Sequence, residues 1–312
     1  MATPGIIHSG APPQPRLQAR SRRHSETVVK VVLLACAAIS VVTTVGIVIA
    51  LLLPAIEFFR EINFIDFITG TRWAPLFTPS SFGVLPLVTG TLALTFWAAL
   101  VFIPFGLGAA IFMSEYASPR VRGVLKPSLE VLAGIPTVVF GFFALVFFTP
   151  LLRDIGVGVE VFNVLSAGLI IGVMLIPTVA SVSEDAMAAV PGDLRAGAYA
   201  LGATRFKVST RVVVPAAFSG IIASYILAIS RAIGETVIAL IAAGTLAQIV
   251  FDPTRQSETM AAFIAATGIG DVPTGSIEYK TIFAVGLTLF VFTLVMNILS
   301  IRLVRKYREV YE

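Results

Sequence analysis

The sequence predicts an all-α polytopic membrane protein with six transmembrane helices. Hydrophobic residues make up 57% of the 312 residues and charged residues only 13%. The mean hydropathy is +0.94. Long intervals without any charge recur along the chain, and a spanning helix needs about 20 consecutive apolar residues. This composition excludes a soluble globular protein.

Several other classes of protein are excluded by the polar residues. Cys36 is the only cysteine and lies in an apolar run, so no disulfide framework is expected. No His, Cys or carboxylate residues have the spacing of metal ligands, and we expect no metal and no cofactor. The basic residues behind the net charge of +4 are spread over short segments between apolar runs. We therefore expect membrane lipid as the surroundings and no nucleic-acid partner.

The N-terminal part is predicted to be a tail followed by the first span. Residues 1–27 are rich in proline and arginine and show no apolar periodicity. Lys30 and Glu57 then enclose 26 uncharged residues, which is too long for the apolar region of a signal peptide, so we expect a retained span. Residues 58–86 contain prolines, aromatics and charges and are expected to form an outside loop.

The other five spans follow from the remaining apolar intervals. We therefore expect a six-span domain over residues 28–303 and a C-terminal tail over residues 304–312. The predicted spans are 87–113 with a kink at Pro104, 131–152, 161–183, 215–243 with charges inside it, and 281–301.

The distribution of Lys and Arg predicts the orientation. Sixteen of them fall in the two tails, in the loop around residue 122 and in the loop 184–215, whereas five fall on the opposite face. Cytoplasmic segments carry the excess of Lys and Arg, so both termini and the loop 184–215 are expected in the cytoplasm.

The stretch from residue 196 to residue 215 is polar and basic, although it lies between two apolar runs. Gly202 is predicted to end a short helix and Thr204 to cap a second one, so that the two helices form a compact knob. The spacing from Gly202 to Pro215 resembles the "EAA" loop of ABC-importer permeases, which docks on a separate ATPase subunit. An ordinary connection between membrane helices would show much the same pattern. Ala196 stands where that family usually carries glutamate. The docking residues implied by the resemblance are Ala196, Gly197, Ala198, Gly202, Ala203 and Pro215.

No nucleotide site is visible in the sequence. No lysine follows a glycine, so the GK pair of a phosphate-binding P-loop is absent. No segment outside the spans is large enough for an active site, so the chain is not expected to be an enzyme. ATP-driven work would therefore require a partner.

Arg231 and Glu235 interrupt the fifth predicted span. Four residues apart on a helix, they would share a face and form an ion pair. Such residues are costly in a membrane, at about 2.5–3.5 kcal/mol each on insertion scales, and by default they face the protein interior or an aqueous pathway. The pair either joins two spans or lies on a substrate pathway. Arginine suits an anion, since its planar fork gives two parallel hydrogen bonds to phosphate oxygens.

Four further segments give the whole chain a more specific resemblance. SRAIGET (230–236), TGTRWAP (69–75), IPFGLGAAIFMSEYASP (103–119) and LEVLAGIPTVVFGFF (129–143) are similar to segments of PstC permeases, which belong to bacterial phosphate importers. With the docking loop they cover most of residues 65–240. PstA permeases share the docking loop and an intramembrane arginine, but TGTRWAP and LAGIPTVVFG favour the PstC type.

The resemblance implies a type I ABC-importer permease fold in the plasma (inner) membrane. It also implies a heterodimer with a PstA-like sister permease, two PstB-like ATPase subunits, and a PstS-like phosphate-binding protein, either periplasmic or lipid-anchored. Arg231 would attract phosphate in the pathway, and Glu235 would neutralise the arginine between transport events.

Two other functions remain open at this level. The chain would also fit a permease for sulfate, molybdate or phosphonate, or an ion-coupled secondary carrier in which Glu235 carries a proton. The segment 246–279 is either an interfacial helix that contacts the binding protein or a cover over the pathway. Glu115 and Glu130 are expected to be solvated carboxylates at the membrane surface.

Overall fold

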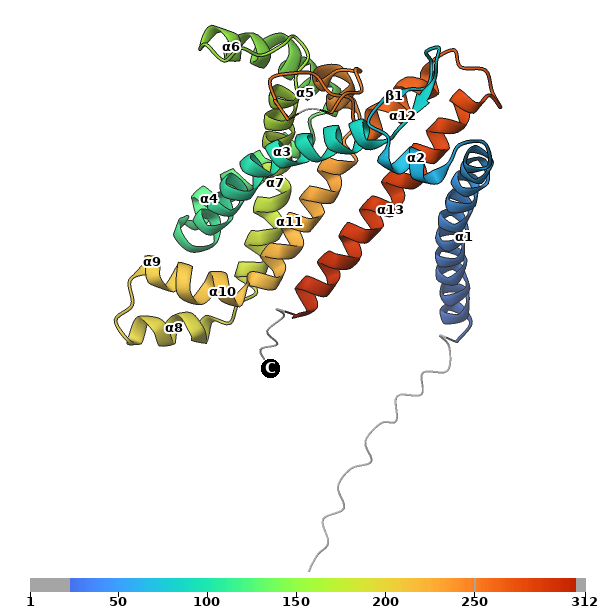
Figure 1. Ribbon diagram of the computed structural model, residues 1–312. Helices are drawn as coiled ribbons and strands as arrows, with labels where there is room; N and C mark the ends of the chain where they lie inside the picture. Colours follow the sequence, from blue (N-terminus) through green and yellow to red (C-terminus); the bar gives the residue numbers. More distant parts are fainter. Residues whose placement is uncertain (1–22, 250, 307–312) are drawn as a thin grey trace, which may run out of the picture. The chain divides into compact units, whose positions relative to one another are not determined.

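The computed structural model describes residues 23–249 and 251–306, and it divides into two compact units, residues 1–50 and 51–312 (Figure 1). The first unit contains most of helix α1 (Arg23–Glu61). This helix begins at Arg23, so the last residues of the predicted tail 1–27 are already helical. Residues 1–22 of that tail lie outside the described part of the chain.

Five described helices are long and apolar enough to cross a membrane. They cover Glu26–Glu61, Leu85–Tyr116, Thr137–Asp154, Val164–Ala188 and Ile277–Arg302. Five of the six predicted spans are therefore confirmed as helices, with shifted ends. The all-α class is also confirmed, apart from one hairpin of two short strands.

The third span starts later than predicted. Residues 131–133 belong to a separate helix, α4 (Pro119–Ala133), which is capped by the Ser118 side chain. The chain breaks at residues 134–136 before α5 (Thr137–Phe142), the π-helical segment η2 (Phe143–Phe148) and α6 (Thr149–Asp154) continue as one span. Pro136 lacks the backbone N–H that a continuous helix would use. The expected start at Val131 is therefore wrong by six residues.

The fifth predicted span does not form a single helix. Helix α9 (Arg205–Val208), segment η3 (Ser209–Val213) and α10 (Val214–Ala216) run into α11 (Phe218–Ile233) with a bend of 71°. Helix α11 ends at Ile233 with Gly234 as its C-cap, and after two residues without regular structure a short helical turn leads into η4 (Ala239–Ala243). The interruption expected at Arg231 and Glu235 is present, but the predicted span 215–243 bends near Ala217, and its long helix ends at Ile233.

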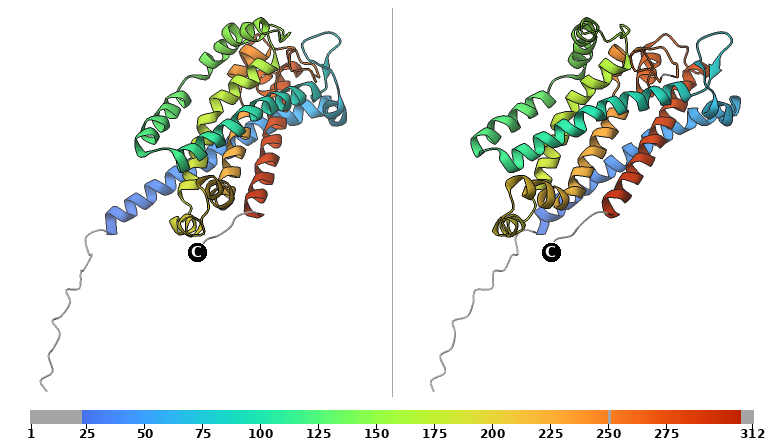
Figure 2. Two further views of the ribbon diagram at one scale, coloured as in Figure 1. Left: turned by 90° about the vertical axis from the view of Figure 1, so that its left-hand side faces the viewer. Right: turned by 60° about the vertical axis from the view of Figure 1, so that its left-hand side comes forward.

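The core of the second unit is built by α3 (Leu85–Ile111) and α7 (Val164–Ala188), which pack along each other (Figure 2). Glycines make this close approach possible. A Cβ atom on Gly172 would lie 2.5 Å from the Val101 Cβ, and one on Gly106 would lie 2.7 Å from the Val179 Cβ. Helix α11 joins this core through the Ser183–Ser224 hydrogen bond of 2.8 Å.

The segment before α3 contains a β-hairpin that the sequence did not predict. After α2 (Phe64–Thr69), strands β1 (Trp73–Ala74) and β2 (Ser81–Phe82) form an antiparallel hairpin in which Trp73 pairs with Phe82. Gly70 and Gly83 hold the base of the hairpin, where any Cβ would lie 2.3–2.5 Å from the opposite backbone. Helix α12 (Met260–Ile269) packs its Phe263 ring edge-on against Trp73.

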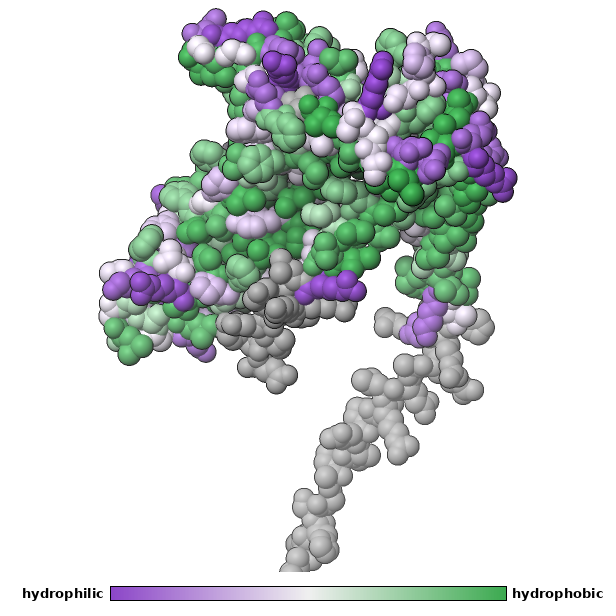
Figure 3. Space-filling view, viewed as in Figure 1, coloured by the Kyte–Doolittle hydropathy of each residue, from purple (hydrophilic) through white to green (hydrophobic). Residues whose placement is uncertain are grey.

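Different secondary-structure elements lie at the two ends of the second unit. Figures 1 and 2 show α8 (Gly192–Ala200), α9 and α10 at one end, with the C-terminal end of α13 (Ile277–Lys306), and β1 and α12 at the other. In Figure 3, hydrophobic residues cover the middle of this unit and hydrophilic residues gather toward both ends. Helix α13 extends to Lys306, past the predicted start of the tail at residue 304. The rest of that tail, 307–312, lies outside the described residues.

Candidate functional site

A pair of short helices projects from the second unit between α7 and α11. We call residues 192–216, which form α8, α9, η3 and α10, the docking knob. The backbone of Gly202 adopts φ +77°, the left-handed conformation that ends helices. The Thr204 Oγ1 atom accepts the Lys207 N–H at 3.4 Å and caps α9. The predicted local structure of the knob is confirmed.

The tip of the docking knob is apolar and exposed. Leu201 is 90% exposed and Phe206 is 68% exposed. Among the predicted docking residues, Ala196, Gly197, Gly202 and Pro215 are also exposed, whereas Ala198 and Ala203 are half-buried against the knob's own core. Exposed apolar side chains that cluster outside the spans are candidates for contact with a partner protein or with the membrane surface.

The docking knob is anchored to the membrane helices by Arg195. Its Nη2 atom lies 3.0 Å from Glu115 Oε1 and also donates to the Met187 carbonyl at 2.8 Å, while its Nη1 donates to the Val190 carbonyl at 2.6 Å. Glu115 belongs to the π-helical segment η1 (Phe112–Tyr116) at the end of the second span, and its side chain is buried. The expectation that Glu115 is solvated is therefore wrong, whereas Glu130 is exposed as predicted.

A second ionic cluster lies at the end of α7. Glu184 is completely buried and accepts hydrogen bonds from Arg122 and from Lys126, whose Nζ lies 2.9 Å from Glu184 Oε2. Lys126 also contacts the exposed Asp185 at 2.9 Å. The hydrogen bond to Glu184, followed by the one to Asp185, raises the pKa of Lys126. The cluster fixes α4 against α7.

Arg231 and Glu235 do not form the predicted ion pair, and none of the ion pairs among the described residues includes either of them. The reason is local, because α11 ends at Ile233 and the two side chains no longer share a helix face. Glu235 Oε1 instead accepts the backbone N–H groups of Val237 and Ile238 at 3.2 and 3.3 Å. The buried carboxylate thus caps the turn that begins η4.

The guanidinium of Arg231 is consequently exposed at the break in the fifth span. Its one described hydrogen bond is a long one, 3.5 Å from Nη1 to the hydroxyl of Thr178 on α7. The neighbouring Ser230 donates to Asn297 of α13 at 2.9 Å and so links α11 to the last span. Most of the donor capacity of Arg231 remains available to an anion.

The sequence reasoning missed the two ionic anchors, Glu115–Arg195 and the cluster around Glu184. One signal was available, since Arg122 and Lys126 are four residues apart and share a face of a helix. The partner was not recognisable, because the fourth span was predicted to end at Ser183. Helix α7 runs on to Ala188 and buries Glu184.

The fold is that of ABC-importer permeases. A permease of the bacterial alginate ABC transporter superposes with a TM-score of 0.62 over 92% of this chain and 98% of its own, at 16% identity. A permease chain of the methionine transporter MetNI superposes with a TM-score of 0.55 over 73% of this chain and 95% of its own, also at 16% identity.

Residues 102–309 match the family described as "Binding-protein-dependent transport system inner membrane component", and the chain belongs to this family. It is 34% identical to the probable ABC transporter permease protein YqgH of Bacillus subtilis, over 92% of both chains. It is 30% identical to the phosphate transport system permease protein PstC of Haemophilus influenzae, over 78% of this chain and 82% of the relative. The protein is therefore a multi-pass inner-membrane permease subunit of an ABC transporter.

Proposed function

We propose that this chain is the PstC-type permease subunit of an ATP-driven importer of inorganic phosphate. The observation that carries the proposal is Arg231, an exposed arginine at the broken fifth span, whose described contacts include no carboxylate. A fixed guanidinium attracts phosphate and stays charged at every relevant pH. The phosphate-transport names of several relatives support the same substrate.

The docking knob is the proposed contact with a separate ATPase subunit. Its exposed Leu201 and Phe206 supply an apolar contact surface. In this proposal, ATP is hydrolysed by two PstB-like partner subunits, a PstA-like sister permease completes the pathway, and a PstS-like protein delivers phosphate. Both termini and the docking knob lie in the cytoplasm, in agreement with the excess of Lys and Arg in these segments.

Coupling would run through the ionic anchors. Movement of the docking knob would act on the second span through Arg195 and Glu115. It would act on the C-terminal end of α7 through the carbonyl of Met187, and on the residues that follow α7 through the carbonyl of Val190, since Arg195 donates to both. The cluster around Glu184 would carry α4 with α7. In the pathway, Arg231 would attract the anion, and Glu235 would maintain the break that presents Arg231. The attraction must stay weak enough for phosphate to leave.

Competition and energy coupling test the proposal. The chain would be reconstituted in liposomes with its sister permease, ATPase and phosphate-binding protein, and uptake of labelled phosphate would be measured. We expect uptake that requires ATP, resists an uncoupler, and is suppressed by unlabelled phosphate but not by sulfate, molybdate or a phosphonate. Suppression by one of those other anions would point to a different oxyanion permease. Loss of uptake with the uncoupler would point to a secondary carrier.

A further inference from the structure

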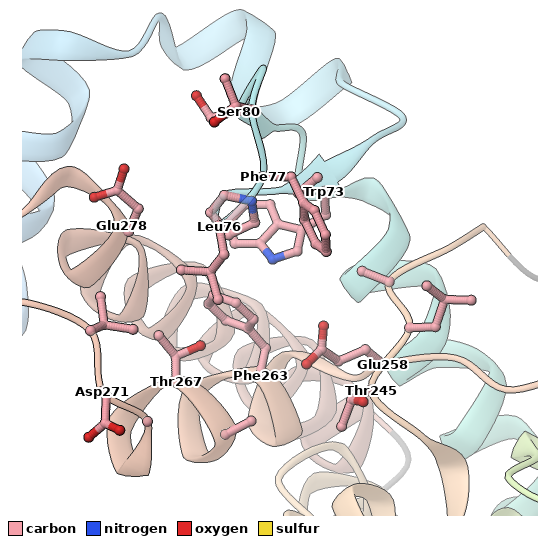
Figure 4. Close-up of a pocket in the computed structure, with 18 of the residues that line it drawn as sticks. Trp73, Leu76, Phe77, Ser80, Thr245, Glu258, Phe263, Thr267, Asp271 and Glu278 are labelled. Carbon is pink, nitrogen blue, oxygen red and sulfur yellow. The ribbon is translucent and has the colours of Figure 1, made fainter.

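A cavity opens at the end of the second unit opposite the docking knob. Its volume is about 980 Å³. The hairpin of β1 and β2 forms one wall, and α12 with the segments around it forms the other (Figure 4). Its walls are largely apolar, with Leu76, Phe77 and Phe263 among the lining side chains. The cavity is separate from Arg231, which does not line it.

The ionisable groups that line the cavity are all acidic. They are Glu258, Asp271 and Glu278, and no lysine, arginine or histidine is among the lining residues. The carboxylates of Asp271 and Glu278 repel an anion such as phosphate and favour a cation, even while the buried Glu258 is protonated. Phosphate is therefore a poor occupant of this cavity, and a positively charged side chain is a good one.

The wall contains a buried donor without a partner. Trp73 is 5% exposed, and its ring nitrogen Nε1 is the one buried side-chain polar atom of the described residues that has no hydrogen-bond partner. Buried polar groups normally have one, so the unused N–H indicates a missing acceptor. Figure 4 shows the Trp73 ring nitrogen and the Glu258 carboxyl group turned toward the interior of the cavity.

Glu258 is poised for a positively charged partner. It is 6% exposed, and its carboxyl group makes no hydrogen bond with any described residue, although its backbone N–H binds the Leu246 carbonyl at 3.1 Å. Burial raises the pKa of Glu258 to about 8. A cation inserted beside it would favour the ionised form, and the resulting charge-assisted hydrogen bond is among the strong ones.

The position of the wall is fixed before any partner arrives. Trp73 is held by pairing with Phe82 and by edge-on contacts of its ring with Phe67 and Phe263. Glu258 is held by Gly90, where a Cβ would lie 2.4 Å from the Glu258 carbonyl oxygen. Binding to such preformed walls requires little ordering of the receptor.

We propose that this cavity receives a loop of the substrate-binding protein that inserts a lysine or arginine side chain beside Glu258 and a backbone carbonyl onto the Trp73 ring N–H. The inference rests on the proposed function, since the end of the unit opposite the docking knob then faces the binding protein. It favours one of the two roles left open for segment 246–279, that of contacting the binding protein.

Binding of the phosphate-binding protein to the reconstituted complex in nanodiscs tests this inference. We expect Glu258→Gln to weaken binding about tenfold or more and Trp73→Phe to weaken it about two- to tenfold, because each removes one hydrogen bond of the proposed kind. The matched control is Asp154→Asn at the end of α6, an exposed carboxylate outside the cavity, which should leave binding unchanged. Equal binding by all four proteins would overturn the inference.

Two further readouts identify the occupant and separate the two proposals. A benzoylphenylalanine placed at Phe77, which is 71% exposed on the cavity wall, should cross-link to the binding protein. Cross-linking to the sister permease instead would contradict the proposed occupant. Phosphate uptake by Glu258→Gln should persist at a saturating concentration of the binding protein. A wild-type complex that transports no phosphate would overturn the proposed function. The binding measurement would then still decide whether the cavity receives the binding protein.

Discussion

For single ionisable side chains, the sequence predicted their presence in a span but not their contacts. The presence of Arg231 and Glu235 in the fifth span was visible as a break in an apolar run, whereas the attraction of an anion by Arg231 stays a prediction. The geometry of the pair was not predictable, because it depends on where α11 ends. Glu184 was overlooked for a related reason, since its burial depends on how far α7 extends and on its packing with α4.

Glu184 and Asp185 are neighbours in the chain with opposite environments, and they provide a matched pair of substitutions. Glu184→Gln should lower the free energy of unfolding in detergent by about 1.5–3 kcal/mol, because it removes charged hydrogen bonds from a completely buried carboxylate. Asp185→Asn should cost about 0–1 kcal/mol, because this carboxylate is largely exposed. Equal losses in the two variants would show that burial of Glu184 is not what stabilises the cluster.

Glu235 can be tested for the role that its contacts indicate. Glu235→Gln keeps an oxygen that accepts the two backbone N–H groups, so phosphate uptake should stay close to that of the wild type. Glu235→Ala removes the acceptor, and the loss of a cap costs about 0.5–2 kcal/mol, so uptake and thermal stability should both fall. A glutamine variant as inactive as the alanine variant would mean that the charge itself is required.

At the level of secondary-structure elements, the sequence predicted the helix ends that single residues determine. The left-handed Gly202 and the cap at Thr204 were readable in the sequence, and both are present in the docking knob. The bend of 71° between α10 and α11 and the separate helix α4 were not predicted, although Pro215 and Pro136 lie next to the breaks. A proline marks a probable break but does not say whether the helix kinks or ends. The hairpin of β1 and β2 was missed because each strand has two residues.

Two glycines allow the conformation of the docking knob to be tested without steric interference. An added Cβ at Gly202 or at Gly123 would meet nothing within 4 Å, but only Gly202 has a positive φ. Gly202→Ala should therefore strain the knob by about 1–2 kcal/mol and weaken binding of the ATPase subunit several-fold. Gly123→Ala in α4 should leave that binding unchanged, since alanine favours a helix. Identical binding by the two variants would argue against the knob as the docking element.

For the whole molecule, composition alone established a polytopic helical membrane protein, and the spacing of charges located most of the spans. What the sequence did not reveal is the arrangement of the second unit, in which the docking knob lies at one end and β1 and α12, which help to line the acidic cavity, lie at the other (Figure 1). Those relations depend on contacts between segments far apart in the chain, such as Trp73 with Phe263 or Glu115 with Arg195. The two ends suit contacts with different partners.

The stability of the isolated subunit should depend on pH through Glu258. Its pKa is raised from 4.5 to about 8 in the folded protein, so the folded state holds the proton more tightly than the unfolded state. Stability should therefore decline as pH rises from about 4.5 to 8 and level off above that range. The cause of the shift is the burial of the Glu258 carboxyl group.

Thermal unfolding in detergent at a series of pH values would measure this dependence. Glu258→Gln should remove the part of the decline that belongs to Glu258 and make the subunit more stable than the wild type above pH 8. The Asp154→Asn control should keep the slope of the wild type. A Glu258→Gln profile parallel to that of the wild type would show that Glu258 ionises normally in the folded state.

The most direct test of phosphate transport through this chain is to measure phosphate uptake and ATP hydrolysis in the same proteoliposomes, with Arg231 or Arg302 changed to glutamine. Arg302 is an exposed arginine near the end of α13 and serves as the matched control. We expect Arg231→Gln to assemble, to hydrolyse ATP in response to the loaded binding protein, and to lose at least about tenfold in phosphate uptake, since it removes one strong ionic contact. Arg302→Gln should retain both activities. Normal uptake by Arg231→Gln would contradict the account.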